Sequence, residues 1–316
     1  MNDYKNFKEF YDIKLVPDLQ ELDKERKQVD RKVIIIGIIA VIIIIIIGRF
    51  RGNGTTYFQI LAGIVAFIVI SAVSKNYRQN FKSKIISKIA GFVDESLVYT
   101  PEGMVPKEEF VNSAIFRKHC NEFRGEDHFH GKMGKTAIEF SEIVAKNVTT
   151  TGTGSKRKEH RKTLFKGIFF VADFNKHFKT HTIVLPDTAE KMLGKFGQNL
   201  QAMSGSRGEL IRLEDPEFEK EFCVYADDQV EARYILSSSL MKRIVDFKRK
   251  WDTKVYLSFR DSKIYIAIKM NKNLFETRLF KSIVDYNFIE ENIQFLILIT
   301  DIVNDLNLNT RIWTKE

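Results

Sequence analysis

Two long apolar runs near the N-terminus constrain the fold of this chain more than any other feature. Residues 33–48 form a run of sixteen without a polar side chain, eleven of them Ile, and residues 57–74 form a run of eighteen without a charge. A membrane-spanning helix needs about 17–25 mainly apolar residues, and flanking Arg and Lys side chains can extend a short span by reaching toward the head groups. The intervening segment RFRGNGTT is typical of a turn. The sequence therefore predicts a transmembrane hairpin over residues 33–74.

A buried helix pair and a cleaved signal peptide both fit these runs less well than a membrane hairpin does. Helices that are apolar on every face are uncommon in soluble cores, which argues against the buried pair. The signal peptide is disfavoured because the first run begins only after residue 32, is followed by no small-residue cleavage site and precedes a second span.

Basic residues beside the two runs predict the orientation of the hairpin. Ten of them flank its outer ends, whereas only Arg49 and Arg51 lie in the turn. The ten are Lys24, Arg26, Lys27, Arg31, Lys32, Lys75, Arg78, Lys82, Lys84 and Lys88. Because cytoplasmic flanks carry the excess of Lys and Arg, we expect a multi-pass protein of a bacterial inner membrane with both termini in the cytoplasm.

Composition excludes several other classes of protein. Hydrophobic residues make up 44% of the 316 residues, which is too many for an intrinsically disordered chain. Two cysteines cannot form a disulfide scaffold. The net charge of +9 could indicate a nucleic-acid-binding protein, but much of the basic excess flanks the spans and is explained by topology.

The segments beside the hairpin are predicted to be helical. Residues 1–32 carry apolar side chains at spacings of three and four, interrupted by Pro17, which predicts a cytosolic amphipathic helix. Its apolar face could pack on the protein's own cytosolic domain, or lie on a membrane or a partner. Residues 75–91 predict a basic juxtamembrane helix. Lysines at such a position attract anionic head groups, so we expect lipid contact from Lys75, Arg78, Lys82, Lys84 and Lys88.

The remaining residues, 92–316, are long enough for a cytosolic domain with its own core. Strands are predicted at 96–100, 135–145, 163–174, 181–186, 222–226, 254–259 and 263–270, with a hairpin turn at Arg260, Asp261 and Ser262. Helices are predicted at 106–120, 187–194, 227–251 and 287–308. Because strands cluster without regular alternation with helices, the fold class is predicted as α+β with a mainly antiparallel sheet.

One short segment contains the residue types of a metal site. Cys120, Asp127, His128 and His130 lie within CNEFRGEDHFHGKMG, and His-x-His on a strand places both imidazoles on one face. No well-separated third ligand is evident, and the glycines indicate a plain hairpin, so we expect no metal and no other cofactor. Cys223 lies between Phe222 and Val224 and is expected in the core.

A polar loop with many basic residues is predicted at 149–162, where the sequence is TTTGTGSKRKEHRK. It is not a phosphate-binding loop, because Ser155 and Lys156 occur in reverse order and no Gly stands five residues before Gly154. A solvated hairpin loop is the favoured interpretation of residues 156–162. Contact with anionic lipid is the alternative. Nucleic acid is not expected, because no aromatic residues interleave with the charges.

Several motifs together resemble a family of bacterial membrane proteins, domain-of-unknown-function family 3137. They are FKEFYDIKLVPDLQELDKER before the spans, then FRGEDHFHGKMGKTAIEFSEIVA, LFKGIFFVADFNKHFKTHTIVLPD, LEDPEFEKEFCVYADDQVEARYILSSSLMKRI, LSFRDSKIYIAI and NLFE at 273–276. The resemblance implies an inner-membrane protein with a cytosolic domain and no established enzyme activity. It supplies no catalytic residues, and it hints at LemA-type membrane proteins as partners.

These observations favour a non-enzymatic membrane protein whose cytosolic domain binds a protein partner or serves envelope regulation. Two hypotheses from other classes remain open. One is a membrane-tethered metal-dependent hydrolase that uses Asp127, His128 and His130. The other is a sensor of anionic lipid that uses the juxtamembrane lysines and the 156–162 loop.

Overall fold

The chain forms two compact units. The computed structural model describes residues 6–49, 55–152, 157–174, 178–187, 208–306 and 308. The helical unit comprises Met1–Val93 and Phe275–Phe295, and the sheet unit comprises Asp94–Leu274 and Leu296–Glu316. Residues 275–295 thus group with the N-terminal helices and not with the predicted body of 92–316. The fold class is α+β, as predicted.

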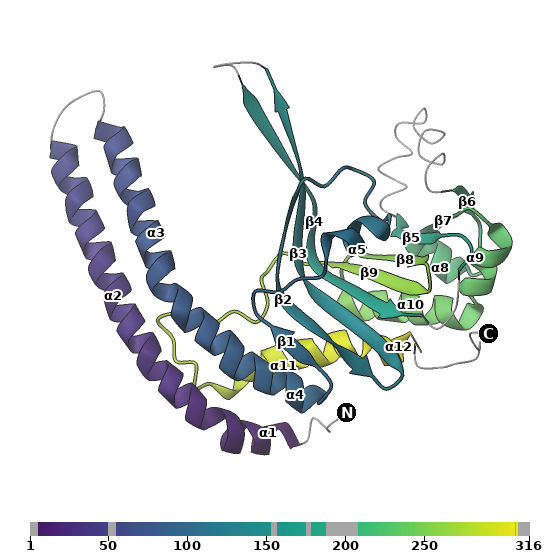
Figure 1. Cartoon of the computed structure of the whole chain (residues 1–316), viewed down its shortest axis with the longest axis horizontal. Coiled ribbons are helices and arrows are strands. Elements are labelled where there is room, and N and C mark those ends of the chain that lie inside the picture. The colour runs from purple at the N-terminus through teal and green to yellow at the C-terminus, as the bar shows by residue number, and fades with distance from the viewer. Residues whose placement is uncertain are drawn as a thin grey trace. The chain divides into compact units, whose positions relative to one another are not determined.

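Two long helical stretches dominate the helical unit (Figure 1), and each contains one π-helical turn. The first consists of α1 (Phe7–Phe10), the π turn η2 (Tyr11–Leu15) and α2 (Val16–Arg49). The second consists of α3 (Thr55–Phe81), the π turn η3 (Lys82–Ile86) and α4 (Ser87–Val93). Both stretches continue well past the apolar runs, so each run is one part of a longer helix.

Both stretches contain a segment that could cross a membrane. Phe7–Arg49 and Thr55–Val93 each include an 18-residue window that is apolar enough, and none of either window is buried within the protein. At about 1.5 Å per residue, such a window matches the hydrocarbon thickness of a bilayer. The polar side chain of Gln59 within the second run donates a hydrogen bond to the carbonyl oxygen of Ile44, 3.2 Å away. These observations indicate membrane association.

Pro17 does not interrupt the first helix, contrary to the prediction. A proline normally breaks a helix because it lacks an N–H and its ring meets the carbonyl four residues earlier. Here the π turn η2 ends at Leu15, and the N–H of Val16 bonds to the carbonyl of Tyr11. The wider turn accommodates Pro17 at the start of α2, because π-type bonding displaces the carbonyls that the ring would meet.

The amphipathic face of the first stretch is buried within the helical unit. Phe7, Leu15 and Leu19 are fully buried. The ring of Phe10 stacks on that of Phe92 in α4, with centroids 4.4 Å apart. The predicted apolar stripe therefore packs within the protein's own helical unit, whereas the first alternative drawn from the sequence named the cytosolic domain.

A cluster of buried charges lies in α2 just before the apolar run. Arg26 is 6% exposed, and its guanidinium bonds to Asp23 Oδ1 at 2.8 Å and to Asp30 Oδ2 at 2.5 Å. The two carboxylates also accept backbone N–H groups from near the C-terminus. Phe280 donates to Asp30 at 3.1 Å and Ile283 donates to Asp23 at 3.3 Å. The charges thus hold residues 275–285, named here the strap, against α2.

The second helical stretch binds the strap as well. The buried Tyr77 hydroxyl donates to the carbonyl of Arg278 at 3.2 Å and accepts from Thr277 Oγ1 at 2.8 Å. Lys82 is 5% exposed and pairs with Glu276 at 3.0 Å. Phe275 and Phe280 have positive φ values of 52° and 61°, which bulky residues adopt only when the surroundings determine them.

The ionisation of Asp23 follows from these contacts. Burial alone would raise its pKa, but hydrogen bonds from Arg26, from the Ile283 N–H and from Lys27 outweigh burial and lower the pKa to about 2. Asp23 is therefore charged throughout the physiological pH range, so the strap is held by a permanent ionic network.

Within the described residues, the sheet unit contains one nine-stranded sheet in the order β1-β2-β3-β4-β9-β8-β5-β7-β6, and every recorded pairing is antiparallel. The strands are β1 (Val98–Thr100), β2 (Glu122–Met133), β3 (Thr136–Thr151), β4 (Lys158–Asp173), β5 (Thr182–Pro186), β6 (Glu209–Ile211), β7 (Phe222–Ala226), β8 (Val255–Arg260) and β9 (Lys263–Lys269). The predicted hairpin between β8 and β9 is present. Asp261 and Ser262 form its turn with φ values of 51° and 66°, as a two-residue hairpin turn requires.

Helices flank the sheet in Figure 1. They are α5 (Lys107–Asn112), α8 (Pro216–Glu221), α9 (Gln229–Ile235), α10 (Ser238–Trp251) and α12 (Ile302–Asp305), while α11 (Tyr286–Thr300) begins in the helical unit and ends in the sheet unit. Strands β5 and β7 are buried at every residue.

Three predicted helices differ from their bounds. The one predicted at 287–308 is divided at Asp301 into α11 and α12. The helix predicted at 106–120 ends at Asn112, because Ala114 takes a positive φ of 52°. The helix predicted at 227–251 is two helices, since Ser237 leaves the helical conformation and caps α10. The helix predicted at 187–194 lies outside the described residues after Asp187.

We expect Arg26→Met to destabilise the helical unit by about 3–5 kcal/mol, because it leaves the two buried carboxylates without a partner. Amides of the strap, above all those of Phe280 and Ile283, should exchange faster with deuterium in the full chain in detergent. The neighbouring Lys27→Met is the matched control. Lys27 also pairs with Asp23, at 3.3 Å, but its side chain is 63% exposed, so its loss should cost less than about 1 kcal/mol. Equal effects from both variants would contradict the assigned role of Arg26.

Candidate functional site

His128 and His130 lie on one face of β2, as the spacing predicted. Their ring centroids are 5.3 Å apart, and His128 Nε2 lies 3.2 Å from Glu139 Oε2 on β3. Glu139 is directly opposite His130 in the strand register. The three side chains line a groove of about 1040 Å³. Sequence reasoning missed Glu139, although the antiparallel pairing of two predicted strands could have identified it once the register was known.

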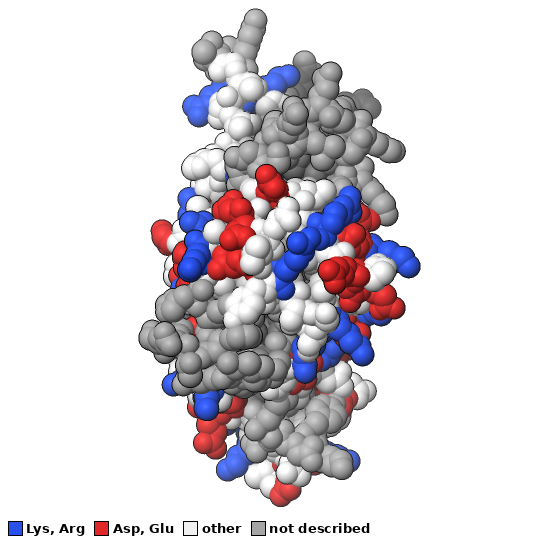
Figure 2. Space-filling view, turned by 90° about the vertical axis from the view of Figure 1, so that its right-hand side faces the viewer, with Lys and Arg blue, Asp and Glu red and all other residues white. Residues whose placement is uncertain are grey.

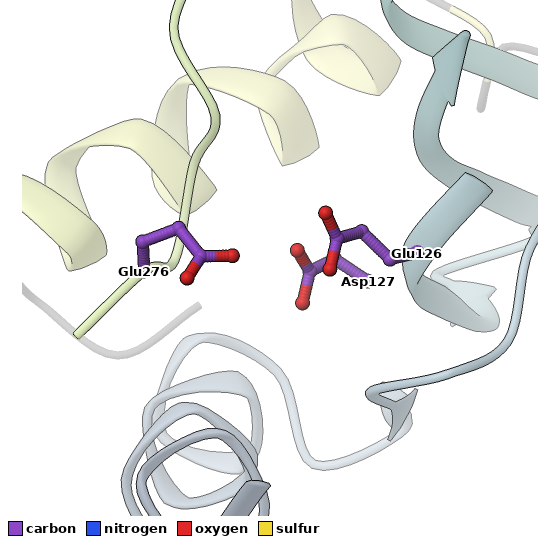
Figure 3. Close-up of side chains that lie close together, drawn as sticks. All are labelled: Glu126, Asp127 and Glu276. Atoms are coloured by element: carbon purple, nitrogen blue, oxygen red, sulfur yellow. The ribbon is translucent and has the colours of Figure 1, made fainter. Parts of the chain in front are cut away.

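Asp127 does not join the two histidines. The register of β2 shifts between Glu126 and Phe129, and Asp127 takes a positive φ of 59° at this bulge. The carboxylates of Glu126 and Asp127 extend from the bulge in Figure 3. Asp127 is 1% exposed and accepts a hydrogen bond from the Tyr99 hydroxyl. Its carboxylate is therefore part of the packing between β1 and β2.

Both cysteines lie in one hydrophobic cluster of the sheet unit. The thiol of Cys120 contacts the carbonyl of Glu122 at 3.4 Å, and that of Cys223 contacts the carbonyl of Leu185 at 3.6 Å. Burial raises the pKa of the Cys120 thiol. A protonated, buried thiol is a poor nucleophile and a poor metal ligand.

Three of the five residues expected to contact lipid head groups form ion pairs within the helical unit. Lys82 is buried against Glu276, as described above. Lys84 lies 3.3 Å from Glu21, and Lys88 pairs with Asp18. Lys75 and Arg78 are exposed. The protein itself thus engages the lysines farther along the second stretch, and the two residues nearest the apolar run present the exposed basic surface.

The predicted loop at 149–162 is mostly strand. The structure places Thr149–Thr151 in β3 and Lys158–Lys162 in β4, paired from Thr149 with His160 to Thr151 with Lys158. Lys156 lies outside the described residues. The β-branched run Val148-Thr-Thr-Thr was the available signal for a strand here. Residues 147–151 and 158–163, named here the arm, project beyond the rest of the sheet in Figure 1.

The arm extends past both neighbouring strands. On one side β2 pairs with β3 only as far as Lys146, opposite Glu122. On the other side β9 pairs with β4 only from Gly167 onward, with one further bond from the Met270 N–H to the Lys166 carbonyl. Among the described residues, no strand pairs with the outer edge of β4 at 158–165. A bulge at Leu164, between the pairs Ala145–Phe165 and Lys146–Thr163, separates the arm from the sheet.

A side chain satisfies the outer edge of β3. The amide of Asn121 donates to the Val148 carbonyl and accepts from the Val148 N–H, both at 2.7 Å. Asn147 donates to the His119 carbonyl, also at 2.7 Å. Asn121 therefore occupies the bonds that a neighbouring strand would make at Val148, so β4 presents the longer open edge of the arm.

Charges at the base of the arm are organised around Glu122. Its carboxylate lies 2.9 Å from Lys146 and 3.5 Å from Arg161, and the hydrogen bond from Lys146 lowers the pKa of Glu122. On the arm itself, Lys162 lies close enough to Lys118 that its hydrogen bond and positive charge lower the pKa of Lys118.

Residues 163–308 match the model of a family described as "Protein of unknown function (DUF3137)". This match confirms the predicted family resemblance over the second half of the chain. The matched region contains the later motifs that suggested it, and the motifs before residue 163 lie outside it. No curated protein and no solved structure matches the chain.

We expect Asn121→Ala to expose the outer edge of β3. The Val148 amide should lose its protection from hydrogen exchange, and stability should fall by about 1 kcal/mol because two exposed hydrogen bonds are lost. Asn147→Ala is the control, since it removes one bond from the same strand and leaves the Val148 amide bonded to Asn121. An unchanged exchange rate at Val148 in Asn121→Ala would show that the side chain does not cap this edge.

Proposed function

We propose, for a chain whose residues 163–308 match a family of proteins of unknown function, that it is a non-enzymatic protein of a bacterial inner membrane. Both of its termini face the cytoplasm, and its sheet unit binds a protein partner at the same membrane, in a regulatory role in the cell envelope. The arm is the contact surface, and the open edge of β4 is the observation that carries this proposal.

An open edge of this length is unusual in a soluble domain. Exposed edges offer unpaired N–H and C=O groups to other chains, and natural sheets keep them short or cover them. The terminal strands of this sheet, β1 and β6, are three residues each. By contrast, β4 presents an open edge over residues 158–165, which include residues 158–163 of the arm. Addition of a strand to such an edge is a common mode of peptide recognition.

Charge favours an acidic partner strand. Lys158 and Lys162 are exposed on β4, and Arg157 directly precedes this strand. Figure 2 shows Lys and Arg intermixed with Asp and Glu on one face of the sheet unit, with no broad field of a single sign over the described residues there. A local basic edge on a surface of mixed charge suits a protein better than a nucleic acid, which requires a continuous positive footprint.

The buried thiols support binding over catalysis. Nucleophilic catalysis by cysteine requires an accessible thiolate beside a base, whereas Cys120 and Cys223 lie in the hydrophobic cluster. The groove with His128, His130 and Glu139 is the place where a metal-dependent activity would be sought.

A reporter fused after Glu316 tests the placement of the sheet unit. Ten basic residues on the outer flanks against two in the turn predict that a reporter active only in the cytoplasm is active in this fusion. The same reporter inserted in the 49–56 turn serves as the control and should be inactive. The reverse pattern would place the sheet unit outside the cytoplasm.

Site-specific photo-crosslinking of the full chain in its native membrane tests the contact surface. A crosslinking residue at Thr163, on the open edge, should give one discrete protein adduct, and one at Glu217 on α8 should not. Lys158→Glu with Lys162→Glu should reduce the adduct about fivefold or more, because acidic side chains repel an acidic strand. Lys179→Glu with Lys242→Glu, at two exposed lysines elsewhere on the sheet unit, is the charge-matched control.

Three results would contradict the proposal. Adducts at Thr163 that contain only lipid would assign the arm to the membrane surface. Equal adducts from Glu217 would show that the contact is not specific to the arm. An adduct that the control pair reduces equally would show that net charge alone governs the contact.

A further inference from the structure

A polar pocket of about 600 Å³ lies in the sheet unit, away from the arm and from the histidine groove. Its wall is formed where β5 and β9 end and β8 begins, together with the ends of α8 and α10. Five basic and three acidic side chains line it. They are Lys220, Lys248, Arg249, Lys254 and Lys269, with Asp187, Glu221 and Asp252.

Two of the five basic residues have acidic partners. Lys248 pairs with Glu221 and lies 5.7 Å from the centre of the Phe222 ring. Arg249 lies 3.6 Å from Glu217. Both residues also occupy the last turn of α10, where positive charge offsets the helix dipole. Their presence therefore has a local structural cause, and they do not by themselves indicate a ligand.

In the part of the chain that the structure describes, neither an ion pair nor a helix end explains the presence of Lys254 and Lys269. The register of β8 and β9 pairs Val255 with Ile268, so the preceding and following residues, Lys254 and Lys269, are directly opposite each other. The Lys269 N–H donates to the Lys254 carbonyl at 2.9 Å, and Thr253 Oγ1 donates to the Lys269 carbonyl at 2.7 Å. Residues opposite each other on an antiparallel pair project to the same side, and like charges there are destabilising.

The backbone thus places two lysine side chains on the same side of the strand pair, in the wall of a pocket. Among the described residues, no ion pair is recorded for Lys254, Lys269 or Lys220. A bound anion removes the repulsion between such groups and forms charge-assisted hydrogen bonds with them. The volume is within the range of small-molecule sites.

We propose that this pocket binds a small phosphorylated molecule, with the phosphate held between Lys254 and Lys269 and approached by Lys220. The acidic side chains define the rest of the ligand. Asp252 and Asp187 at the pocket lining offer acceptors for hydroxyl or amino groups, so the ligand is a phosphate ester that carries such donors. The binding does not depend on the proposed partner of the arm.

Calorimetric titration of the full chain in detergent with inorganic pyrophosphate tests the site. We expect one saturable site whose affinity falls about tenfold or more in Lys254→Ala with Lys269→Ala, because both charge-assisted contacts are lost. Lys179→Ala with Lys242→Ala removes the same total charge at exposed positions outside the pocket and should change the affinity less than about twofold.

Lys269→Glu separates binding from folding. It places an acidic side chain opposite Lys254, so the thermal midpoint should rise or stay unchanged while pyrophosphate binding is lost. The proposal is overturned if the double alanine variant binds as tightly as the original chain, if the control pair weakens binding equally, or if binding does not saturate.

Discussion

The helical unit depends on the buried network of Asp23, Arg26 and Asp30. A guanidinium shared by two carboxylates satisfies its own charge. Asp30 accepts the Phe280 N–H at its other oxygen, and Asp23 Oδ1 accepts both Arg26 and the Ile283 N–H. Without this network the strap would place unpaired polar backbone against apolar helices, which is costly. Residues separated by about 250 positions in the sequence are thereby joined in one compact unit.

The contacts with the strap give several basic residues a structural role besides the one expected from their place beside the apolar runs. Arg26 and Lys82 count toward the orientation rule, yet both are buried and paired within the protein. A buried ion pair contributes little net stability compared with apolar packing, but removal of one partner is severe. These residues therefore hold the strap in the folded protein, while Lys75 and Arg78 are exposed near the apolar run.

The sequence predicted features that depend on local pattern. Apolar length located the two helices that could cross a membrane. Alternation predicted most strands and the face shared by His128 and His130, and turn residues located the hairpin at Asp261 and Ser262. The strap could not be predicted, because its partners are far away in sequence and its positive φ values at Phe275 and Phe280 oppose local preference. The bulge at Asp127 could not be predicted either, because a prediction from alternation assumes an unbroken register.

The two proposed surfaces differ in how much of the chain they require. Every residue that lines the polar pocket falls between Pro186 and Asn271, inside the region matched by the family model. The arm lies almost wholly before that region: of residues 147–151 and 158–163 only Thr163 falls inside it, and the cap Asn121 also precedes it. A chain that contained only the matched region could build the pocket wall from β8 and β9, whereas it would lack both strands of the arm. We therefore expect the function of the matched region, in any protein that contains it, to depend on the pocket. The arm should instead make a contact that is specific to chains that also contain β2 and β3.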